Sequence, residues 1–568
     1  MTKLGRYWHT LRHLEPVQFY GRVWFMLYRP RVNALATTKA LRVPSGEWRR
    51  PAARGVSMLG PAQFRFLNQT HTMPAQGGWN DAAREKLWLY NLHYFDDLNA
   101  RDAHVRRDWH RALIGRWVAE NPPASGNGWE PYPTSLRIVN WVKWLATGNP
   151  AVPGMLESLS LQAAWLSRRL EWHLLGNHLF ANAKALVFAG LCFEGPQAAS
   201  WLATGLKIIT DELPEQVLAD GGNFERSPMY HAIFLEDVLD LINAANCWTG
   251  IVSEVQVATW RETAGRMLGW LAAMTHPDGE IALFNDAAFC VAPDVAELIA
   301  YAERLGVTNS HQDREPFRAD FITSWSTEVE ATKSNNKLGL LHLSASGYVR
   351  LQKQDAVALV DVAHIGPDYL PGHAHADTLS FELSVFGQRV VVNGGTSRYG
   401  VGLERLRERG TAAHSTVEVA GQNSSEVWGG FRVARRAYPF NLQLQDQADV
   451  LQVACSHDGY KRLSSAPIHR REWEMAPGSL HVADTVLGGT HTAVARYILH
   501  PDVKVIAANN SSWHLTLAGG QNLCVMVLEG QGRIQPASYA PEFGIVLPTQ
   551  CLAVDLIQGQ ARVKWIWS

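Results

Sequence analysis

The side chains best suited to chemistry fall in two well-separated parts of the chain. An amide and an imidazole stand together at Asn177 and His178, and Tyr230 follows further along. The second part is the segment GHAHAD at 372–377, which adds His373 and His375. An amide, a phenol and several imidazoles can hold a carboxylate and move protons, so we expect acid–base chemistry beside an anionic group.

Abstraction of a carbon proton from a uronic acid needs such a set. The C5 proton lies beside a carboxylate, and its removal places a second negative charge on that group. An amide or a protonated imidazole near the carboxylate lowers the cost of this charge. A Tyr or His takes the proton, and a Tyr can protonate the leaving glycosidic oxygen. The residues therefore predict a polysaccharide lyase that works by β-elimination on a uronate-containing glycan.

Arg226 and Tyr230 are four residues apart in DGGNFERSPMYH and share one face if this segment is helical. A guanidinium beside the phenol would favour the phenolate form of Tyr230, so Arg226 is predicted to tune the acid–base group and to contact substrate. Structural alternatives remain for both motifs. Asn177 could cap a helix, and Tyr230 could simply pack against Arg226.

His373 and His375 would point the same way if GHAHAD were a strand. Imidazoles need partners on both nitrogens, so such a pair favours metal binding or acid–base work. His414 in RGTAAHSTVEV could join them, and two imidazoles with a carboxylate form a plausible zinc set. Asp377 is a candidate for that carboxylate, or for holding an imidazole in one tautomer.

Hydrolysis by a carboxylate pair is the rival chemistry, with Glu130, Glu225 and Asp286 as candidates. Asp286, in LFNDAAF, is expected instead to shape a turn. Glu130 lies in NGWEPYPTSLR, an aromatic loop that could line a sugar groove, so Glu130, Tyr132 and Arg137 are predicted to bind substrate. No GxSxG motif supports a serine hydrolase.

A third alternative is a non-catalytic protein that binds glycans or assists exopolysaccharide assembly. The chain has 22 Trp residues, whose rings could stack on sugars or simply fill large cores.

The 46% hydrophobic and 18% charged content indicates a globular protein, and 568 residues are enough for two large domains. A net charge of −1 without a basic stripe argues against nucleic acid as a partner. The oligomeric state does not follow from the sequence.

No apolar run is long enough to span a bilayer, and the N-terminus lacks the apolar core of a signal peptide. These features predict a cytoplasmic protein, with periplasmic or cell-envelope association as the alternative. The basic, aromatic first turns are expected to pack onto the body of the protein, although such turns can also contact a membrane surface. The six cysteines are scattered and predict neither a disulfide scaffold nor a cysteine zinc site.

Periodicity divides the chain into a helical arm at 1–50, a helical domain at 51–326 and a strand-rich domain at 338–568, with a polar linker around 327–337. The helical domain predicts an incomplete α/α toroid, with a helical bundle as the alternative, and the strand-rich domain an antiparallel β-sandwich. The fold class is therefore α+β multidomain. Expected helices are 156–174, 179–193, 232–246 and 255–274. Expected strands are 346–351, 356–363, 379–385, 389–393, 416–419, 450–456, 480–486 and 524–528.

Several of these segments together resemble the heparinase II/III-like family of polysaccharide lyases, which is related to heparin, heparan sulfate and alginate lyases. The matching stretches are NGWEPYPTSLRIVNW, GNHLFANAKAL, DGGNFERSPMYH, GHAHADTLSFEL with VVNGGTSRYG, and RGTAAHSTVEVAGQNSSEVWGGFRVARRA. The resemblance implies an α/α toroid followed by a β-sandwich, with the active site in the cleft between them. It also implies β-elimination on an acidic polysaccharide.

The resemblance also implies roles for individual residues. Asn177 and His178 would bind the uronate carboxylate, and Tyr230 would act as the acid and could also act as the base. His373 would be base or charge neutraliser according to the uronate epimer, and Tyr399 would lie nearby. Several relatives carry zinc, and His375 and His414 resemble two of its ligands. The third ligand in that pattern is Asp, whereas Asn393, a poor zinc ligand, stands here.

Overall fold

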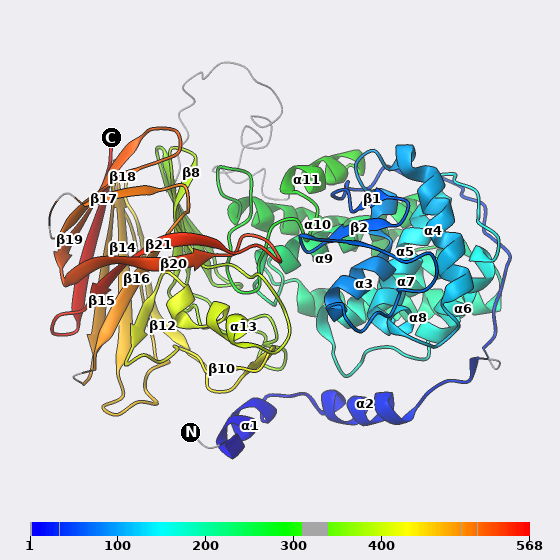
Figure 1. Cartoon of the computed structure of the whole chain (residues 1–568), viewed down its shortest axis with the longest axis horizontal. Coiled ribbons are helices and arrows are strands. Elements are labelled where there is room, and N and C mark those ends of the chain that lie inside the picture. Colours follow the sequence, from blue (N-terminus) through cyan, green and yellow to red (C-terminus); the bar gives the residue numbers. More distant parts are fainter. Residues whose placement is uncertain (1–2, 33–34, 309–338, 490, 508, 510) are drawn as a thin grey trace.

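The computed structural model describes residues 3–32, 35–308, 339–489, 491–507, 509 and 511–568. A helical half and a β half lie side by side, and an N-terminal arm runs along both (Figure 1). The arm contains helices α1 (Lys3–Leu11) and α2 (Pro16–Leu27). The linker expected at 327–337 lies outside the described residues. The predicted α+β layout, an open helical toroid followed by antiparallel sheets, is confirmed.

A small antiparallel sheet, which the sequence patterns did not predict, precedes the helices of the toroid. Its strands are β1 (Met58–Gly60), β2 (Gln63–Phe66) and β3 (Gln69–Thr72). The α-helices that follow are α3 (Lys86–Tyr94), α4 (Arg107–Glu120), α5 (Pro131–Ala146), α6 (Met155–Leu166), α7 (Gly176–Cys192), α8 (Pro196–Gln216), α9 (Pro228–Cys247), α10 (Glu254–Ala273) and α11 (Val295–Arg304). Short 3-10 helices lie at Asp96–Asn99, Ala103–Arg106 and Asn127–Trp129.

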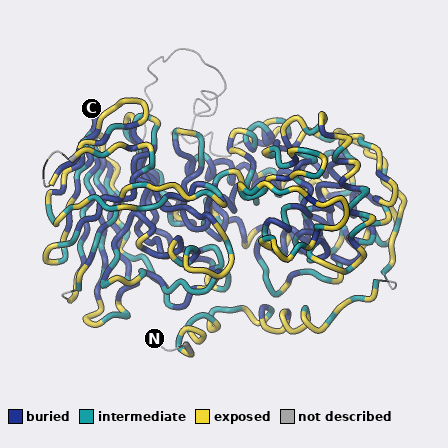
Figure 2. The backbone as a smooth tube through the Cα atoms, in the orientation of Figure 1, coloured by how far each residue is buried: buried dark blue, intermediate teal, exposed yellow. Residues whose placement is uncertain are grey.

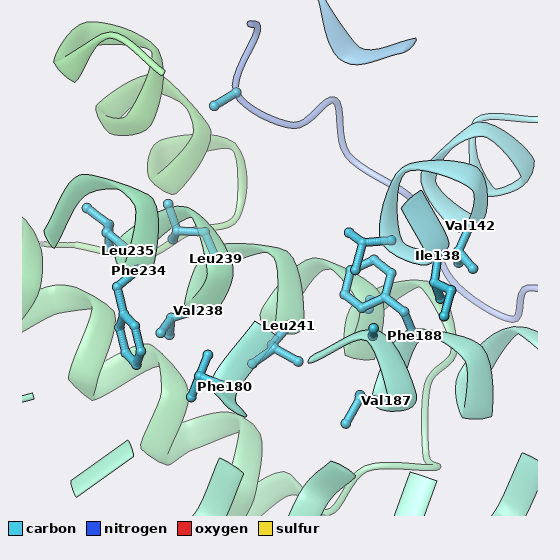
Figure 3. Packing of buried hydrophobic residues seen from close by; sticks show 14 of the residues in the cluster. Ile138, Val142, Phe180, Val187, Phe188, Phe234, Leu235, Val238, Leu239 and Leu241 are labelled. Carbon is cyan, nitrogen blue, oxygen red and sulfur yellow. The ribbon is translucent and has the colours of Figure 1, made fainter. Parts of the chain in front are cut away.

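The core of the toroid forms where α5, α7 and α9 pack together (Figure 3). Phe180 of α7 lies against Phe234 of α9, with ring centroids 4.2 Å apart. Helix α7 is buried almost all round, because its sequence GNHLFANAKALVFAGLC is largely apolar and its buried Asn182 and Lys184 are paired with carboxylates. A helix enclosed in this way holds its first residues, Asn177 and His178, in a fixed position.

The expected helix at 156–174 is wrong in its second half, because α6 ends at Leu166. Residues 167–175 form turns instead. Within them, the backbone N–H of Glu171 donates to Oδ1 of Asn182 (2.9 Å), and Asn182 Nδ2 donates to the Glu171 carboxylate (3.1 Å). These side-chain bonds replace the helical ones, and they bring Glu171 next to the start of α7.

The β half consists of two large antiparallel sheets that enclose an apolar core. One sheet has the order β20-β21-β16-β8-β7-β6-β5-β4, with β9 paired to β16, and the other has the order β12-β13-β14-β15-β22-β19-β18-β17. The strands are β4 (Leu340–Leu343), β5 (Tyr348–Lys353), β6 (Ala356–Asp361), β7 (Phe381–Val385), β8 (Gln388–Val392), β9 (Val417–Val419), β12 (Pro439–Asp446), β13 (Leu451–His457), β14 (Ile468–Ala476), β15 (Ser479–Leu487), β16 (Ala493–Leu499), β17 (Lys504–Ala507), β18 (Ser512–Thr516), β19 (Asn522–Glu529), β20 (Gln531–Tyr539), β21 (Leu547–Asp555) and β22 (Gln560–Trp567). A hairpin of β10 (Val427–Trp428) and β11 (Arg432–Val433), helix α13 (Leu403–Glu408) and a 3-10 turn (Thr411–Ala413) lie beside them.

Buried polar contacts join the two halves. Nδ1 of His276, which follows α10, lies 2.8 Å from Oγ of Ser384 in β7, and its Nε2 lies 2.9 Å from Glu382. Arg350 of β5 donates to the backbone oxygens of Ala273 and Thr275, each at 2.9 Å. Groups buried in this way must stay paired, so the contacts hold the two halves in one relative orientation. Within the described residues, no helix combines the length and the apolar character required to cross a bilayer.

Candidate active site

A cavity of about 1900 Å³ lies where the two halves and the arm meet. Of the predicted site residues, Asn177, His178, Tyr230, His373, Tyr399 and Tyr132 line it. These side chains come from both halves, so the tertiary structure gathers the two chemical segments into one place.

Most Trp side chains in the described residues are buried, whereas Trp428 lines this cavity. The Trp content therefore serves mainly the core.

Tyr230 lies in the first turn of α9, and the start of this helix determines its position. Ser227 caps the helix, since its Oγ accepts the N–H of Tyr230 (3.2 Å), and Pro228 occupies the first turn. The same Oγ donates to the backbone oxygen of Asp286 (2.5 Å). One serine therefore links the phenol-bearing helix to the segment that carries Asp286.

His373 lies between Tyr230 and Asp286. Its ring packs on that of Tyr230 with centroids 3.9 Å apart. Its Nδ1 lies 2.9 Å from Oδ2 of Asp286. The two segments are also paired through the backbone, since the N–H of Asp286 donates to the oxygen of His373 (2.9 Å). Because Asp286 holds Nδ1, the other ring nitrogen, Nε2, is the one that is available toward the cavity.

Asp286 is fully buried and has several cationic or imidazole partners. Arg405 of α13 binds both carboxylate oxygens, with Nη2 2.6 Å from Oδ2, and His375 Nε2 lies 2.8 Å from Oδ1. Burial alone would raise the pKa of Asp286, but Arg405 and the two imidazoles hold that pKa well below its usual range. Asp286 is therefore an ionised carboxylate that orients His373.

Tyr230 and Tyr399 share a hydrogen bond, with their hydroxyl oxygens 2.9 Å apart. Burial, and then the nearby Tyr399 and Asp286, raise the pKa of Tyr230 well above its usual value. Tyr230 is therefore a neutral phenol at neutral pH and carries a proton that it can donate. Arg405 lies over the ring of Tyr399, 5.0 Å from its centroid, and helps to hold that ring in place.

Asn177 and His178 lie in the first turn of α7 and also line the cavity. Burial lowers the pKa of His178, but the Glu171 carboxylate, 3.3 Å from its Nδ1, and the more distant Glu225 outweigh this and raise it. His178 thus favours the cationic form that an anionic ligand needs. Gly176 allows the turn before them, because its φ is +53° and a Cβ there would lie 2.4 Å from Leu370.

Glu225 is a buried carboxyl group on the cavity wall. Its Oε2 lies 3.6 Å from Nε2 of His373. Burial raises the pKa of Glu225, although the neighbouring imidazoles of His373 and His178 and the backbone N–H of Asn177 oppose this. Glu225 therefore lies between the imidazole and the amide that the sequence singled out.

The predicted role of Arg226 is wrong. Arg226 precedes α9, with a left-handed φ of +59°, and so does not share a helix face with Tyr230. Its Nη1 donates to the backbone oxygen of His364, and its own oxygen accepts from Tyr348 Oη (2.7 Å). Arg226 joins the two halves and lies outside the cavity lining. The expected phenolate of Tyr230 is contradicted by the raised pKa.

The expectation that His373 and His375 lie on a strand is also wrong, because β7 begins only at Phe381. The segment is a loop whose backbone groups bond to other parts of the chain. The N–H of His375 donates to Asn285 Oδ1 (3.1 Å), and Arg409 donates to the oxygen of Ala374 (2.7 Å). Both imidazoles still converge, since each one contacts Asp286.

The segment 127–137, expected to be a loop, is a 3-10 turn followed by the first turns of α5, and it contributes less to the cavity than predicted. Tyr132 lines the cavity, with its ring centroid 4.6 Å from that of His178. Arg137 is buried in the toroid, where it stacks on Trp117 (3.8 Å) and donates to Gly128 O (2.6 Å). Glu130 pairs with Lys86 (2.9 Å) and lies outside the main cavity lining. The substrate-binding prediction for Arg137 is therefore wrong, because its guanidinium is committed to the core.

The described residues do not complete the zinc site expected around His375 and His414. His375 Nδ1 and His414 Nε2 lie 3.2 Å apart, and His375 Nε2 is bound to Asp286. At the third position, Asn393 Oδ1 accepts the N–H of Ser415 (3.1 Å). No cluster of three His, Cys, Asp or Glu side chains suited to a metal occurs in the part of the chain that is described. The donor set does not fit zinc.

Asp377, the other candidate carboxylate, accepts the N–H of Asn285 (3.1 Å), and burial raises its pKa.

The sequence led us to expect that Asp286 shapes a turn, whereas in the structure it orients His373. The sequence did not point to Arg405 at all. A signal for Asp286 was present, because an acidic residue inside the apolar run LFNDAAF has to find buried partners. The sequence contains no comparable signal for Arg405.

The chain is a two-domain protein in which an open helical toroid is joined to an antiparallel β-sandwich. Tyr and His side chains meet in the cleft between the two domains, and this combination defines its class. Two consecutive family models match the chain. Heparinase II/III N-terminus matches residues 106–303, and Heparinase II/III-like, C-terminal, matches residues 336–566. The chain belongs to the heparinase II/III-like family.

The relatives are remote. A heparin-sulfate lyase of Pedobacter heparinus is 27% identical over 326 residues, covering 54% of this chain and 47% of that protein. One from Bacteroides stercoris is 26% identical over 257 residues, covering 44% of this chain and 37% of the relative. The matches thus span about half or less of the curated relatives. A crystal structure of a mutant heparan sulfate lyase HepC from Pedobacter heparinus covers 97% of this chain and 88% of its own, at a TM-score of 0.62 and 18% identity, which shows the shared fold.

Proposed function

We propose that the protein is a polysaccharide lyase that cleaves a uronate-containing glycan by β-elimination. One observation carries the proposal: His373, which is oriented by Asp286, and neutral Tyr230 line the same cavity as Asn177 and His178, whose pKa is raised. Membership of the heparinase II/III-like family and the names of the lyases it resembles support the same reaction class.

The first step is binding of the uronate carboxylate. The side-chain amide of Asn177 donates to one oxygen, and His178, whose pKa is raised against the effect of burial by Glu171, supplies a positive charge. Both groups stabilise the additional negative charge that develops on the carboxylate when the C5 proton leaves. Tyr132, packed on His178, forms part of the same wall.

The second step is proton transfer and bond cleavage. Nε2 of His373 takes the C5 proton, while Asp286 at Nδ1 stabilises the imidazolium that forms. The electrons of the C5–H bond form the C4–C5 double bond, and the C4–O bond breaks. Tyr230 donates its phenolic proton to the leaving oxygen. The proton that His373 took from C5 is then transferred through water to the Tyr230 phenolate. This step restores the neutral imidazole and the neutral phenol.

The structure gives little support to hydrolysis by two carboxylates. Asp286 has both oxygens engaged by Arg405, His373 and His375, and is fully buried. Glu130 lies outside the cavity lining that contains Glu225. A hydrolase needs one carboxyl group as acid and a second as base or nucleophile on opposite sides of the bond. Glu225 has no such partner among these candidates.

The test is the ultraviolet absorbance of the unsaturated uronate that elimination creates. Purified protein is incubated with heparan sulfate, hyaluronan, alginate, glucuronan and bacterial exopolysaccharides. We expect absorbance to rise with at least one of them, and the rate to fall about 10²–10⁴-fold in Tyr230→Phe and in His373→Ala. The matched controls are Tyr438→Phe and His514→Ala, which lie outside the cavity lining and should keep the wild-type rate.

New reducing ends without the absorbance change would favour the hydrolase instead. Retained binding of an acidic polysaccharide with neither signal would assign the protein a non-catalytic role in glycan binding or exopolysaccharide assembly. If the Tyr230→Phe and His373→Ala variants catalysed β-elimination at the wild-type rate, the residue assignments would be contradicted but the reaction class would stand.

A further inference from the structure

The arm, residues 3–31, exposes an unusual number of large apolar side chains for its length. The most prominent are two Trp side chains, Trp8 and Trp24, with 67% and 62% of their surface exposed. Two Leu side chains, Leu4 and Leu27, have 83% and 79% exposed. Six more are exposed on the same two helices, and we call them the inner face: Tyr7, Leu11, Phe19, Tyr20, Val23 and Met26. Figure 2 shows both helices mainly in the colour of exposed residues, in contrast to the helices of the toroid. Apolar groups gathered on a short segment mark an interaction surface.

Several contacts hold the arm to the body at both ends. In α1, Thr10 Oγ1 accepts from Trp428 Nε1 (3.1 Å), and the ring of Tyr7 packs edge-on against Trp428. In α2, Gln18 Nε2 donates to the backbone oxygen of Tyr369 (3.1 Å). The ring of Phe25 lies under the guanidinium of Arg169 (3.6 Å). The arm therefore crosses from the β half to the helical half with its apolar groups exposed.

The exposed apolar residues of the arm divide into two sets. The inner face lines the cavity. Leu4, Trp8, Trp24 and Leu27 lie outside the cavity lining, and we call these four the outer face. By their three- and four-residue spacing they continue the same apolar stripe of each helix as the inner face. Sugar rings stack on aromatic rings, but Leu4 and Leu27 offer branched aliphatic groups that suit an acyl environment better. Trp side chains beside aliphatic ones are typical of a membrane–water interface.

The charge of the arm complements an anionic surface. Arg6, Arg12, Arg22 and Arg29 are exposed on or directly after the two helices, and Glu15 is the single acidic residue of the segment 1–32. The whole chain has a net charge of −1, so this positive charge is local to the arm. Basic side chains flanking an apolar helix face attract anionic lipid headgroups.

We propose that the arm docks the protein on an anionic lipid surface, with the outer face inserted at the headgroup level and the arginines on the headgroups. Because the arm also lines the cavity, docking places that wall of the cavity beside the membrane. The protein would then meet acidic glycans that are held at a lipid surface. Lipid binding requires no turnover, so this proposal stands or falls independently of the lyase reaction.

The experiment is co-flotation of the full chain with vesicles of phosphatidylglycerol or of phosphatidylcholine. We expect binding to phosphatidylglycerol and little to phosphatidylcholine. Replacing the outer face (Leu4→Ser, Trp8→Ser, Trp24→Ser, Leu27→Ser) should lower the partition coefficient at least about tenfold. The pair Arg6→Gln and Arg12→Gln should lower it about fivefold or more.

The matched control is Leu528→Ser with Ile557→Ser, two exposed aliphatic residues of the β half, which should bind vesicles as the wild type does. Thermal unfolding of every variant checks that it is folded. No binding of the wild type to phosphatidylglycerol, or equal binding by the outer-face variant, overturns the proposal. If vesicles are not bound and the outer-face variant loses affinity for a soluble uronate oligosaccharide, the arm serves the glycan instead.

Discussion

Oδ2 of Asp286 lies 2.9 Å from Nδ1 of His373, so a fully buried carboxylate determines how this imidazole faces the cavity. Asp286→Asn should lower kcat about 10²–10⁴-fold, because an amide neither fixes the same tautomer nor stabilises the imidazolium. KM should change little, since Asp286 has no exposed surface that could contact the glycan. Steady-state kinetics separate the two parameters.

The same substitution leaves Arg405 buried without a carboxylate, so a stability loss of about 3–5 kcal/mol should accompany it. Asp278→Asn, which removes another carboxylate between the halves, is the control. It should reduce stability without a selective effect on kcat. Wild-type kcat in a folded Asp286→Asn protein would contradict the assigned role.

Glu171 raises the pKa of His178 against the opposing effect of burial, and Glu171→Gln should therefore let His178 lose its charge at a lower pH than in the wild type. KM should begin to rise at a correspondingly lower pH, and at neutral pH it should be higher on the order of tenfold. The measurement is KM across the pH range. Glu157→Gln, at an exposed ion pair with Lys39, should follow the wild-type profile.

The sign of the stability effect provides a second check. A histidine with a raised pKa in the folded state stabilises that state fully below its ordinary pKa. This contribution is lost as the pH rises through the raised value. The difference in Tm between wild type and Glu171→Gln should thus be larger in acid than in alkali, and the opposite trend would rule out the ion pair.

Glu225 has a raised pKa because it is buried, so its ionisation costs folding free energy above its ordinary pKa. Glu225→Gln should raise Tm at neutral pH, and the gain should vanish as the pH falls below the range in which an ordinary glutamate titrates. Thermal unfolding at several pH values tests this. Exposed Glu254→Gln should show no such pH-dependent gain.

Asn393 stands where the family pattern leads us to expect an acidic zinc ligand. We predict that the purified protein contains well under one zinc per chain, and that a chelator leaves Tm unchanged. Asn393→Asp should add the missing carboxylate near His375 and His414 and so raise the affinity for zinc. Elemental analysis measures the metal content. Stoichiometric zinc in the wild type would show that the donor set is complete after all.

Local patterns in the sequence were sufficient for the main elements. The long apolar runs of α7 and α9, the short apolar run of β6 and the alternation in β15 reflect which side chains are buried, and a single sequence records that directly. The same patterns failed where side chains replace backbone pairing, as in the turns after α6 and the loop that carries His373.

By itself, the sequence determined the types of the chemical groups: an amide and an imidazole at the start of one helix, a phenol further along, and two imidazoles two residues apart. Only the tertiary structure decided which groups act together. Asp286, Arg405 and His373 are distant in the chain, and their charges acquire their effect through burial and contact. Arg226 and Arg137 were assigned to the site by proximity in sequence, but the fold placed their guanidinium groups elsewhere. Electrostatic roles depend on distance and burial in space, and neither can be read from spacing along the chain.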